Sequence, residues 1–250
     1  MKLLAALAGL ALSATAAHAQ VAPLTTWYWQ LSGSINTTRN DVVYDIDGAD
    51  NSTDLIQNLK SQGHKVICYF SAGTWEDWRS DAGAFPQAVK GSSNGWPGEQ
   101  WLDVRSQVVR DLMTKRLDTF KAKSCDGVEP DNVDGYANRS GFPLTAADQI
   151  SYNSFLADAA HQRGLLVALK NDTDQVKQLV GKFDFAIVEE CFRYSECGSY
   201  SPFVTAGKAV LAAEYGTFKS ARCAKAKALK FSLVFFNKNL NGKTFRPCAQ

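Results

Sequence analysis

The chain has 250 residues, of which 45% are hydrophobic and 21% charged, with 27 basic and 25 acidic side chains. This length allows one large domain or two small ones, and the composition is that of a folded protein rather than a disordered or fibrous one. A formal net charge of +2 argues against a nucleic-acid-binding protein. Six cysteines and only three histidines narrow the available chemistry further.

Residues 1–19 have the pattern of a secretory signal peptide. Lys2 precedes the apolar run 3–17, which ends in the small-residue cleavage pattern Ala17-His18-Ala19. The run is too short for a membrane anchor, and no later segment of the sequence is apolar enough to span a bilayer. We therefore expect a secreted, extracellular protein without a membrane partner, in which residues 20–250 form a single domain.

Export to an oxidising compartment makes disulfide bonds the expected state of the six cysteines. Cys191 and Cys197 are close enough in sequence to close one loop (Cys191–Cys197), and a Cys223–Cys248 bond would tie down the C-terminal segment. The remaining pair, Cys68–Cys125, stands beside two predicted strands. A zinc site is the alternative, but the chain has neither a C-x-x-C pair nor a histidine near these cysteines.

Eight short apolar or aromatic segments alternate with helical segments along the mature chain. Strands are predicted over residues 26–31, 42–46, 65–70, 126–129, 165–169, 183–188, 209–213 and 231–235. Helices are predicted over residues 53–62, 103–123, 145–162, 172–180 and 217–228. Several strands are apolar throughout, as in parallel strands that are covered on both faces. This order predicts an α/β fold, a (β/α)8 barrel of the TIM type.

Two parts of the chain depart from a regular barrel. Residues 32–41, between the first two strands, are too few for an ordinary helix, so we expect an irregular connection there. Residues 80–100 are rich in Gly, Ser, Asn and Pro, and are predicted to form a long loop over one face of the barrel. An open doubly wound sheet is the alternative architecture, but it usually shows a Gly-rich phosphate-binding turn, which is absent here.

Carboxylate, amide and aromatic side chains follow nearly every predicted strand. A (β/α)8 barrel carries its active site at the carboxyl ends of its strands, so these side chains are expected to meet at one face. In chain order they are Trp29, Asp45, Asp47, Tyr69, Glu129, Asp131, Asp134, Tyr136, Lys170, Asn171, Glu189, Glu214 and Tyr215.

The rarity of histidine decides between the possible chemistries. Serine–histidine and cysteine–histidine catalysis need a histidine beside the nucleophile. His64 precedes a strand and His161 lies late in a helix, so neither is placed at the expected site. A calcium site is an alternative for residues 131–135, but the closing glutamate of an EF-hand loop is missing. Paired carboxylates remain, which are the groups that glycoside hydrolysis uses.

Aromatic side chains near the same strand ends are suited to stacking on the faces of sugar rings. Besides Trp29, Tyr136 and Tyr215, the tryptophans expected there are Trp27, Trp75, Trp78 and Trp101.

The motifs at the strand ends resemble those of glycoside hydrolase family 114, the endo-α-1,4-polygalactosaminidases. The matching segments follow one another over nearly the whole mature chain. They are Trp29-Gln30-Leu31, Asp45-Ile46-Asp47, residues 68–76, Trp101-Leu102-Asp103, residues 126–136, Lys170-Asn171-Asp172, residues 189–192 with Glu196-Cys197, and Glu214-Tyr215. The resemblance implies a barrel that cleaves α-1,4-linked galactosamine polymers internally, with neither a metal nor an organic cofactor.

The resemblance also implies a catalytic pair. By position, Asp131 matches the catalytic aspartate of the family and Glu189 its catalytic glutamate. The residue before that glutamate is often Asn in the family and is Val188 here, while alignment on the following Cys-Phe selects Glu189 rather than Glu190. Glu189 is expected to be the general acid/base and Asp131 the nucleophile or base, and the two roles can be exchanged.

The expected partner is a cationic amino-sugar polysaccharide. Galactosamine without its acetyl group is positively charged near neutral pH, so carboxylates at the strand ends would attract it. We expect a monomer that binds no nucleic acid. Two alternatives stay open: a non-catalytic protein that binds an amino-sugar polymer on the same barrel, and a barrel glycosidase that acts on a different polysaccharide.

Overall fold

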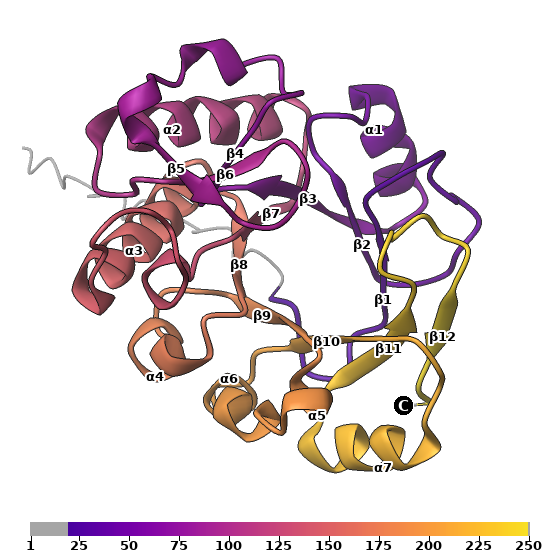
Figure 1. The fold of residues 1–250 in the computed structure, drawn as a ribbon. Helices are drawn as coiled ribbons and strands as arrows, with labels where there is room; N and C mark the ends of the chain where they lie inside the picture. The colour runs from indigo at the N-terminus through magenta and orange to yellow at the C-terminus, as the bar shows by residue number, and fades with distance from the viewer. Residues whose placement is uncertain (1–19, 250) are drawn as a thin grey trace, which may run out of the picture.

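Eight parallel strands curve into a barrel, which Figure 1 shows along its axis. The computed structural model describes residues 20–249, so the predicted signal peptide lies outside the described residues. The strands are β1 (Trp27–Gln30), β2 (Val43–Asp47), β3 (Lys65–Ser71), β7 (Gly127–Asp131), β8 (Leu166–Lys170), β9 (Phe185–Glu189), β10 (Val210–Tyr215) and β11 (Ser232–Phe236). Each strand pairs in parallel with the next one in this order, and all eight predicted strands are present.

The first and last parallel strands meet at the seam of the barrel. Within residues 20–249 no backbone ladder joins β1 to β11, but the indole Nε1 of Trp27 donates to the carbonyl oxygen of Ser232 at 2.9 Å. A short strand, β12 (Phe245–Pro247), pairs antiparallel with β11. The fold is therefore a nearly closed (β/α)8 barrel rather than the open doubly wound sheet considered as the alternative.

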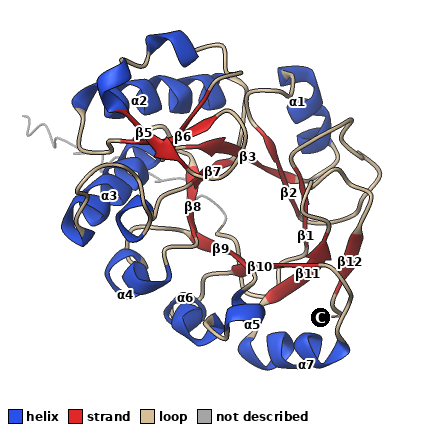
Figure 2. Ribbon diagram, in the orientation of Figure 1, coloured by secondary structure: helices blue, strands red, loops and turns tan. Residues whose placement is uncertain are grey.

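Helices surround the barrel (Figure 2). They are α1 (Thr53–Ser61), α2 (Gln107–Ala122), α3 (Ala146–Gln162), α4 (Val176–Leu179), α5 (Cys191–Tyr194), α6 (Ser201–Thr205) and α7 (Ser220–Leu229). Ser52 caps α1, and Thr145 with Asp148 forms a capping box at α3, as these residue types favour. The helix predicted over residues 172–180 is instead a 3₁₀ turn, η4 (Thr173–Gln175), followed by the single turn α4. Residues 31–42 connect β1 to β2 without a helix, as expected.

The long loop predicted over residues 80–100 is instead part of a structured insertion between β3 and α2. We use "the insertion" for residues 74–102. Its three strands, β4 (Thr74–Glu76), β5 (Lys90–Ser93) and β6 (Glu99–Leu102), form an antiparallel sheet, with the 3₁₀ turns η1 (Ala82–Ala84) and η2 (Gln87–Val89) between β4 and β5. The composition concealed these strands because they are short and mostly polar, so backbone pairing rather than an apolar pattern defines them.

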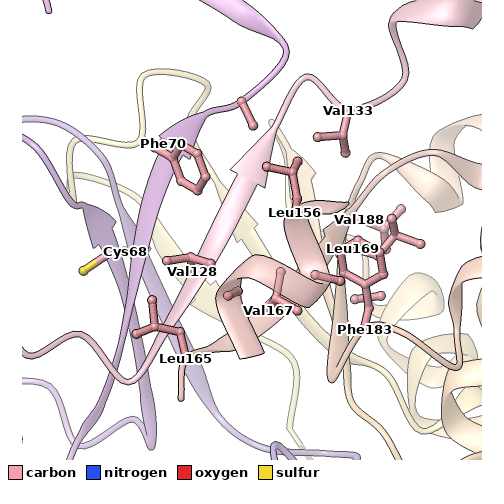
Figure 3. Packing of buried hydrophobic residues seen from close by; sticks show 14 of the residues in the cluster. Cys68, Phe70, Val128, Val133, Leu156, Leu165, Val167, Leu169, Phe183 and Val188 are labelled. Carbon is pink, nitrogen blue, oxygen red and sulfur yellow. The ribbon is translucent and has the colours of Figure 1, made fainter. Parts of the chain in front are cut away.

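Alternation along the strands separates two apolar cores. Outward-pointing side chains such as Val128 and Val167 pack beneath the helices with Leu156 of α3 (Figure 3). Inward-pointing side chains fill the lower barrel, where the rings of Trp27 and Phe236 meet edge to face with centroids 5.4 Å apart. The lower barrel is thus packed solid with side chains.

Three disulfide bonds join the cysteine pairs expected from the sequence. Cys68–Cys125 links β3 to the segment before β7, Cys191–Cys197 closes the turn after β9, and Cys223–Cys248 ties α7 to the C-terminal segment. The first two bonds brace the strands and turns that carry the predicted site residues. No helix in the described part of the chain has both the length and the apolar character needed to cross a bilayer.

Candidate active site

A cavity of about 630 Å³ opens at the carboxyl ends of the barrel strands, and its size is typical of ligand-binding clefts. Nine of the predicted site residues line it: Trp29, Asp47, Tyr69, Asp131, Asp134, Lys170, Asn171, Glu189 and Tyr215. A smaller cavity of about 310 Å³ is lined by Tyr136 and shares Asp134, Asn171 and Glu189 with the larger one. The two cavities therefore meet beside Glu189.

Strand alternation turns both catalytic candidates toward the inside of the barrel. Glu189 ends β9 two residues after Ile187, which faces inward, and Asp131 ends β7 three residues after Val128, which faces outward. Val188 belongs to the outer core, and the carboxylate of Glu190 pairs with Arg193 at 2.7 Å. Glu189 and Asp131 therefore meet at Lys170, whereas Glu190, which also lines the cavity, pairs with Arg193.

The ammonium group of Lys170 joins the carboxylates at the centre of the site. Lys170 is 2% exposed, and its Nζ lies 2.7 Å from Glu129, 3.2 Å from Asp131 and 3.4 Å from Glu189. Burial disfavours the charged ammonium, but the surrounding carboxylates outweigh burial and raise the pKa of Lys170 well above its ordinary value. Lys170 is therefore a permanent cation that holds the two candidates close together.

This shared contact limits the separation of the two candidate carboxylates. Asp131 Oδ1 and Glu189 Oε2 lie 3.2 Å and 3.4 Å from the same nitrogen atom, Lys170 Nζ. The distance between these two oxygens therefore cannot exceed the sum of the two contacts. The limit applies to the two nearest oxygens, and the about 5–5.5 Å spacing of retaining glycosidases lies within it.

A tight turn after β7 aims Asp131 into the cavity. The Tyr69 hydroxyl donates to Asp131 Oδ2 at 3.1 Å, and the backbone N–H of Asn132 donates to Oδ1 at 2.8 Å. Asn132 has a left-handed backbone (φ +60°), and its side-chain amide donates to Ser71 Oγ at 2.9 Å. Only glycine fits at position 73, because a Cβ there would lie 1.7 Å from the Asn132 carbonyl oxygen.

Side chains of the two neighbouring strands orient Glu189. The Asn171 amide donates to Glu189 Oε2 at 3.2 Å, and the Tyr215 hydroxyl donates to Oε1. The backbone N–H of Glu189 in turn donates to Asn171 Oδ1 at 3.0 Å. Burial opposes ionisation of Glu189, but the charge of Lys170 and these hydrogen bonds outweigh it and lower the pKa of Glu189. Glu189 is therefore a carboxylate near neutral pH.

Asp45 and Glu129 lie beneath the cavity rather than in its lining. Both are 0% exposed, so the expectation that they contact substrate is corrected: they stand one step deeper in the barrel than Asp47 and Asp131. Glu129 accepts from the indole Nε1 of Trp29 at 3.1 Å and from Lys170. Burial raises the pKa of Glu129 to about 7, against the opposing charge of Lys170.

Glu214 also fails to reach the cavity, because it occupies an outward position on β10 between Ala213 and Tyr215, which face inward. Its carboxylate accepts from the backbone N–H of Phe192 at 2.9 Å and pairs with Arg222. The predicted role in substrate binding is therefore corrected to a structural one, which holds the first turn of α5 against β10.

Asp47 reaches the cavity wall, but its carboxylate is already fully bonded. Arg79 donates to its two oxygens at 2.7 and 3.1 Å, and the backbone N–H groups of Ala49 and Asp50 add two more bonds at 2.9 and 2.8 Å. Arg79 also pairs with Glu76 at 2.8 Å, so it fastens the insertion to β2. Sequence reasoning missed Arg79, because nothing in the order of residues indicates which carboxylates it will meet.

The insertion supplies cavity lining, of which Trp78 and Trp101 were expected from the sequence and Trp96 and Glu99 were not. Trp78 and Trp96 are 51% and 58% exposed and line the cavity, together with Glu99 of β6. By contrast, Trp27 is buried in the lower barrel and Trp75 packs against the outer core, which corrects the expectation that they contact sugar. For Trp96, the only available signal was the density of tryptophan in a Gly- and Ser-rich segment.

The cavity is acidic although the chain carries a net charge of +2. Eight carboxylate side chains line it, against three cationic ones, namely Arg79, Lys170 and Lys238. Within residues 20–249, no group of three or more histidine, cysteine or carboxylate side chains is arranged to hold a metal ion. In the segment 131–135, which was considered for calcium, the carboxylate of Asp131 pairs with the ammonium group of Lys170 at 3.2 Å.

Comparison with known proteins agrees with this geometry. The model of glycoside-hydrolase family GH114 matches residues 10–250. The chain is similar to Aspergillus fumigatus Ega3, solved in complex with galactosamine, with 40% identity and a TM-score of 0.87 over 92% of this chain and 97% of that one. It shares its fold with the glycoside hydrolase domain of PelA from Pseudomonas aeruginosa, with 14% identity and a TM-score of 0.68 over 88% and 96% of the two chains. No curated protein matches the sequence. The chain belongs to glycoside hydrolase family GH114 and is a glycoside hydrolase.

Proposed function

We propose that this glycoside hydrolase is a secreted, monomeric endo-α-1,4-polygalactosaminidase, with Asp131 and Glu189 as its catalytic pair. The observation that carries the proposal is the placement of both carboxylates on one buried ammonium, Lys170, at the mouth of the barrel. The galactosamine bound to the Aspergillus fumigatus relative supports an amino-sugar substrate. Three disulfide bonds fit an oxidising, extracellular setting.

The close spacing of the pair favours a retaining reaction in two steps. One carboxylic acid protonates the glycosidic oxygen while the other carboxylate attacks the anomeric carbon, and the first then deprotonates the water that releases the sugar. The sequence favours Glu189 as acid/base and Asp131 as nucleophile, with exchange open. The lowered pKa of Glu189 supports the exchanged roles, because a nucleophile must be ionised.

Local charge supports a cationic polymer as the substrate. Each galactosamine unit without an acetyl group carries an ammonium, and the cavity presents more carboxylates than cations. Such complementarity steers the ligand and fixes its register, and it weakens as salt rises. Asp134 supports this view, since it lines both cavities beside Glu189.

The test is a screen of defined α-1,4-linked galactosamine, N-acetylgalactosamine and glucosamine polymers, with new reducing ends as the readout. The galactosamine polymer should be cleaved fastest, with an early fall in chain length that marks internal cutting, and NMR should show α-anomeric products first. Asp131→Asn and Glu189→Gln should each abolish cleavage. Asp118→Asn, a change at a carboxylate that is 60% exposed on α2, is the matched control.

Two outcomes would contradict the proposal. Full activity of either catalytic variant would remove that residue from the pair, and faster cleavage of another polymer would replace the substrate. Azide rescue of Glu189→Ala and Asp131→Ala assigns the roles by the configuration of the product: the nucleophile variant should give the inverted β-glycosyl azide, and the acid/base variant the retained α-glycosyl azide.

A further inference from the structure

Two tryptophans of the insertion lie open to solvent in the same cavity as the catalytic pair. Trp78 and Trp96 are 51% and 58% exposed, and both line that cavity. Large apolar side chains gathered in an otherwise polar cleft indicate a ligand surface, since water is a poor partner for an indole face. The mechanism above uses neither of them.

The insertion fixes the backbone that carries both tryptophans before any ligand binds. Behind Trp78 there is no room for a side chain at position 98, where a Cβ would lie 2.9 Å from the indole and the backbone is left-handed (φ +82°). The turn at Trp96 is closed by its N–H, which donates to Asn94 Oδ1 at 3.0 Å, and by its carbonyl oxygen, which accepts from the Glu99 N–H at 3.2 Å. Such preorganisation reduces the entropy lost on binding.

We propose that Trp78 and Trp96 form an outlying subsite, on which sugar units flanking the cleaved bond stack. This inference rests on the proposed function, and its ligand is the amino-sugar chain itself. A pyranose ring offers an apolar C–H face to an indole and a polar edge to solvent. Glu99, on the same wall, provides a carboxylate for the ammonium groups of the same units.

The subsite predicts that the insertion recognises chain length. Trp78→Ala and Trp96→Ala should each raise KM for the long polymer about tenfold, the effect of uncovering one aromatic face, with kcat within about twofold of the wild type. Cleavage of the shortest oligosaccharide that is hydrolysed should not change. Trp78→Phe and Trp96→Phe should recover most of the loss, and Val108→Ala, on the exposed surface of α2, is the control.

The outcomes separate the subsite from the proposed function. Unchanged KM for the long polymer in both alanine variants, or equal losses on long and short substrates, would overturn the subsite. If the wild type cleaves no galactosamine polymer, the proposed function fails. Calorimetric titration of that polymer into Glu189→Gln, with and without each tryptophan, then decides the subsite: about tenfold weaker binding supports it, and equal binding refutes it.

A second inference concerns Asp45, which lies beneath the catalytic pair. Asp45 is 0% exposed, and no donor in the described chain reaches either of its carboxylate oxygens. The ionisable groups that face it are Glu129 and Asp131 of β7 and Lys170 of β8, while Trp29 and Ile67 stand level with it on the two adjacent strands. A buried carboxylate without a donor is strongly disfavoured.

We infer that Asp45 is a neutral carboxylic acid that donates its proton to Glu129, and so positions Lys170. Glu129 is the ionised member of the pair, because it already accepts from Lys170 at 2.7 Å and from Trp29 at 3.1 Å and has lone pairs left for a third donor. Burial and the neighbouring Glu129 both raise the pKa of Asp45 well above its ordinary value. Asp45 is thus a positioning residue, which acts on the catalytic pair through Glu129 and Lys170.

Infrared difference spectra between the wild type and Asp45→Asn test this protonation directly. At pH 8.5, above the pKa of Glu129, the wild type should show a carbonyl band of a protonated carboxylic acid that the variant lacks, and absence of that band would overturn the inference. Asp45→Asn can still donate to Glu129, so kcat should stay within about threefold, whereas Asp45→Val leaves Glu129 one donor short and should lower kcat by about tenfold to a hundredfold. Equal losses in both variants, with both folded by circular dichroism, would also contradict it.

Discussion

Replacing Lys170 with methionine removes the cation on which the active-site carboxylates depend. Lys170→Met keeps nearly the same length and volume, so packing changes little while the charge disappears. Glu129 then loses a contact of 2.7 Å, and Asp131 and Glu189 lose contacts of 3.2 and 3.4 Å. We expect an increase in the pKa of Glu189, because the charge of Lys170 is what chiefly opposes burial there.

The stability loss follows from leaving buried carboxylates unpaired. Removing one partner of a buried ion pair lowers the free energy of unfolding by about 3–5 kcal/mol. For a domain of this size each kcal/mol shifts Tm by about 2–4 °C, so we expect a decrease on the order of 10 °C.

The loss should depend on pH with a definite sign. The lowered pKa of Glu189 contributes stability above its unfolded pKa, and that stability is lost as pH falls through the folded value. The raised pKa of Lys170 contributes stability below its unfolded pKa, lost only as pH rises through the folded value. The wild type has both contributions at pH 8 and begins to lose the first in acid, so the gap between the proteins should be widest at pH 8 and narrow toward pH 4.

Thermal and urea unfolding at both pH values, followed by circular dichroism, measures this difference. Lys115→Met, at an exposed position of α2, is the control and should leave the free energy of unfolding within about 0.5 kcal/mol. A loss below about 1 kcal/mol at pH 8, or one that does not change with pH, would refute the view that Lys170 neutralises the cluster.

Three further predictions follow from single contacts. Tyr215→Phe removes a hydrogen bond to the carboxylate of Glu189 and so should raise the pKa of Glu189. The limb of the pH–rate profile that Glu189 controls, the basic limb for an acid/base or the acid limb for a nucleophile, should move up by about one unit, and two unmoved limbs would contradict this. Replacing both cysteines of a disulfide bond with serine should lower the free energy of unfolding in urea by an amount that grows with the length of the closed loop. We expect about 4 kcal/mol for Cys68–Cys125, which are 57 residues apart, and about 2 kcal/mol for Cys191–Cys197, which are 6 apart. The reverse order would contradict the dependence on loop length. A hydrogen bond to Asp184 raises the pKa of His161, so the interaction stabilises the fold only where His161 is protonated. After solvent screening, His161→Ala should lower the free energy of unfolding by at most about 0.5 kcal/mol at pH 5 and should not change it at pH 8.5. A loss of stability that grows with pH would contradict this sign.

Several features of the fold were predictable because local signals report them. Apolar runs of four to six residues, most of them between helical segments, predicted all eight barrel strands, and Ser52 and Thr145 are N-caps of ordinary type. The insertion was not predictable in this way. Its strands are recognised only by their pairing with one another, and that pairing depends on contacts between residues far apart in sequence.

The candidate site also has a part that the sequence could predict and a part that only the packed structure shows. Asp131, Glu189 and Tyr215 are the last residues of their strands and face into the barrel, and motifs and strand ends alone were enough to list them. Asp45 and Glu214 stood in the same list, although one lies below the cavity and the other points to the outer core. How deep a side chain lies in the barrel, and whether it faces the inside or the outside, is decided by how the strands pack in the sheet.

By itself, the sequence determined the barrel, the disulfide partners and the identity of the catalytic candidates, because hydrophobic period, cysteine spacing and motif order are written along the chain. Only the tertiary structure decided which carboxylates are solvent-accessible, which share Lys170 and which are neutralised by Arg79. The physical reason is that charge interactions and burial depend on distance and depth in three dimensions. The same carboxylate type therefore becomes a catalytic candidate, a buried acid or an anchor according to where the fold places it.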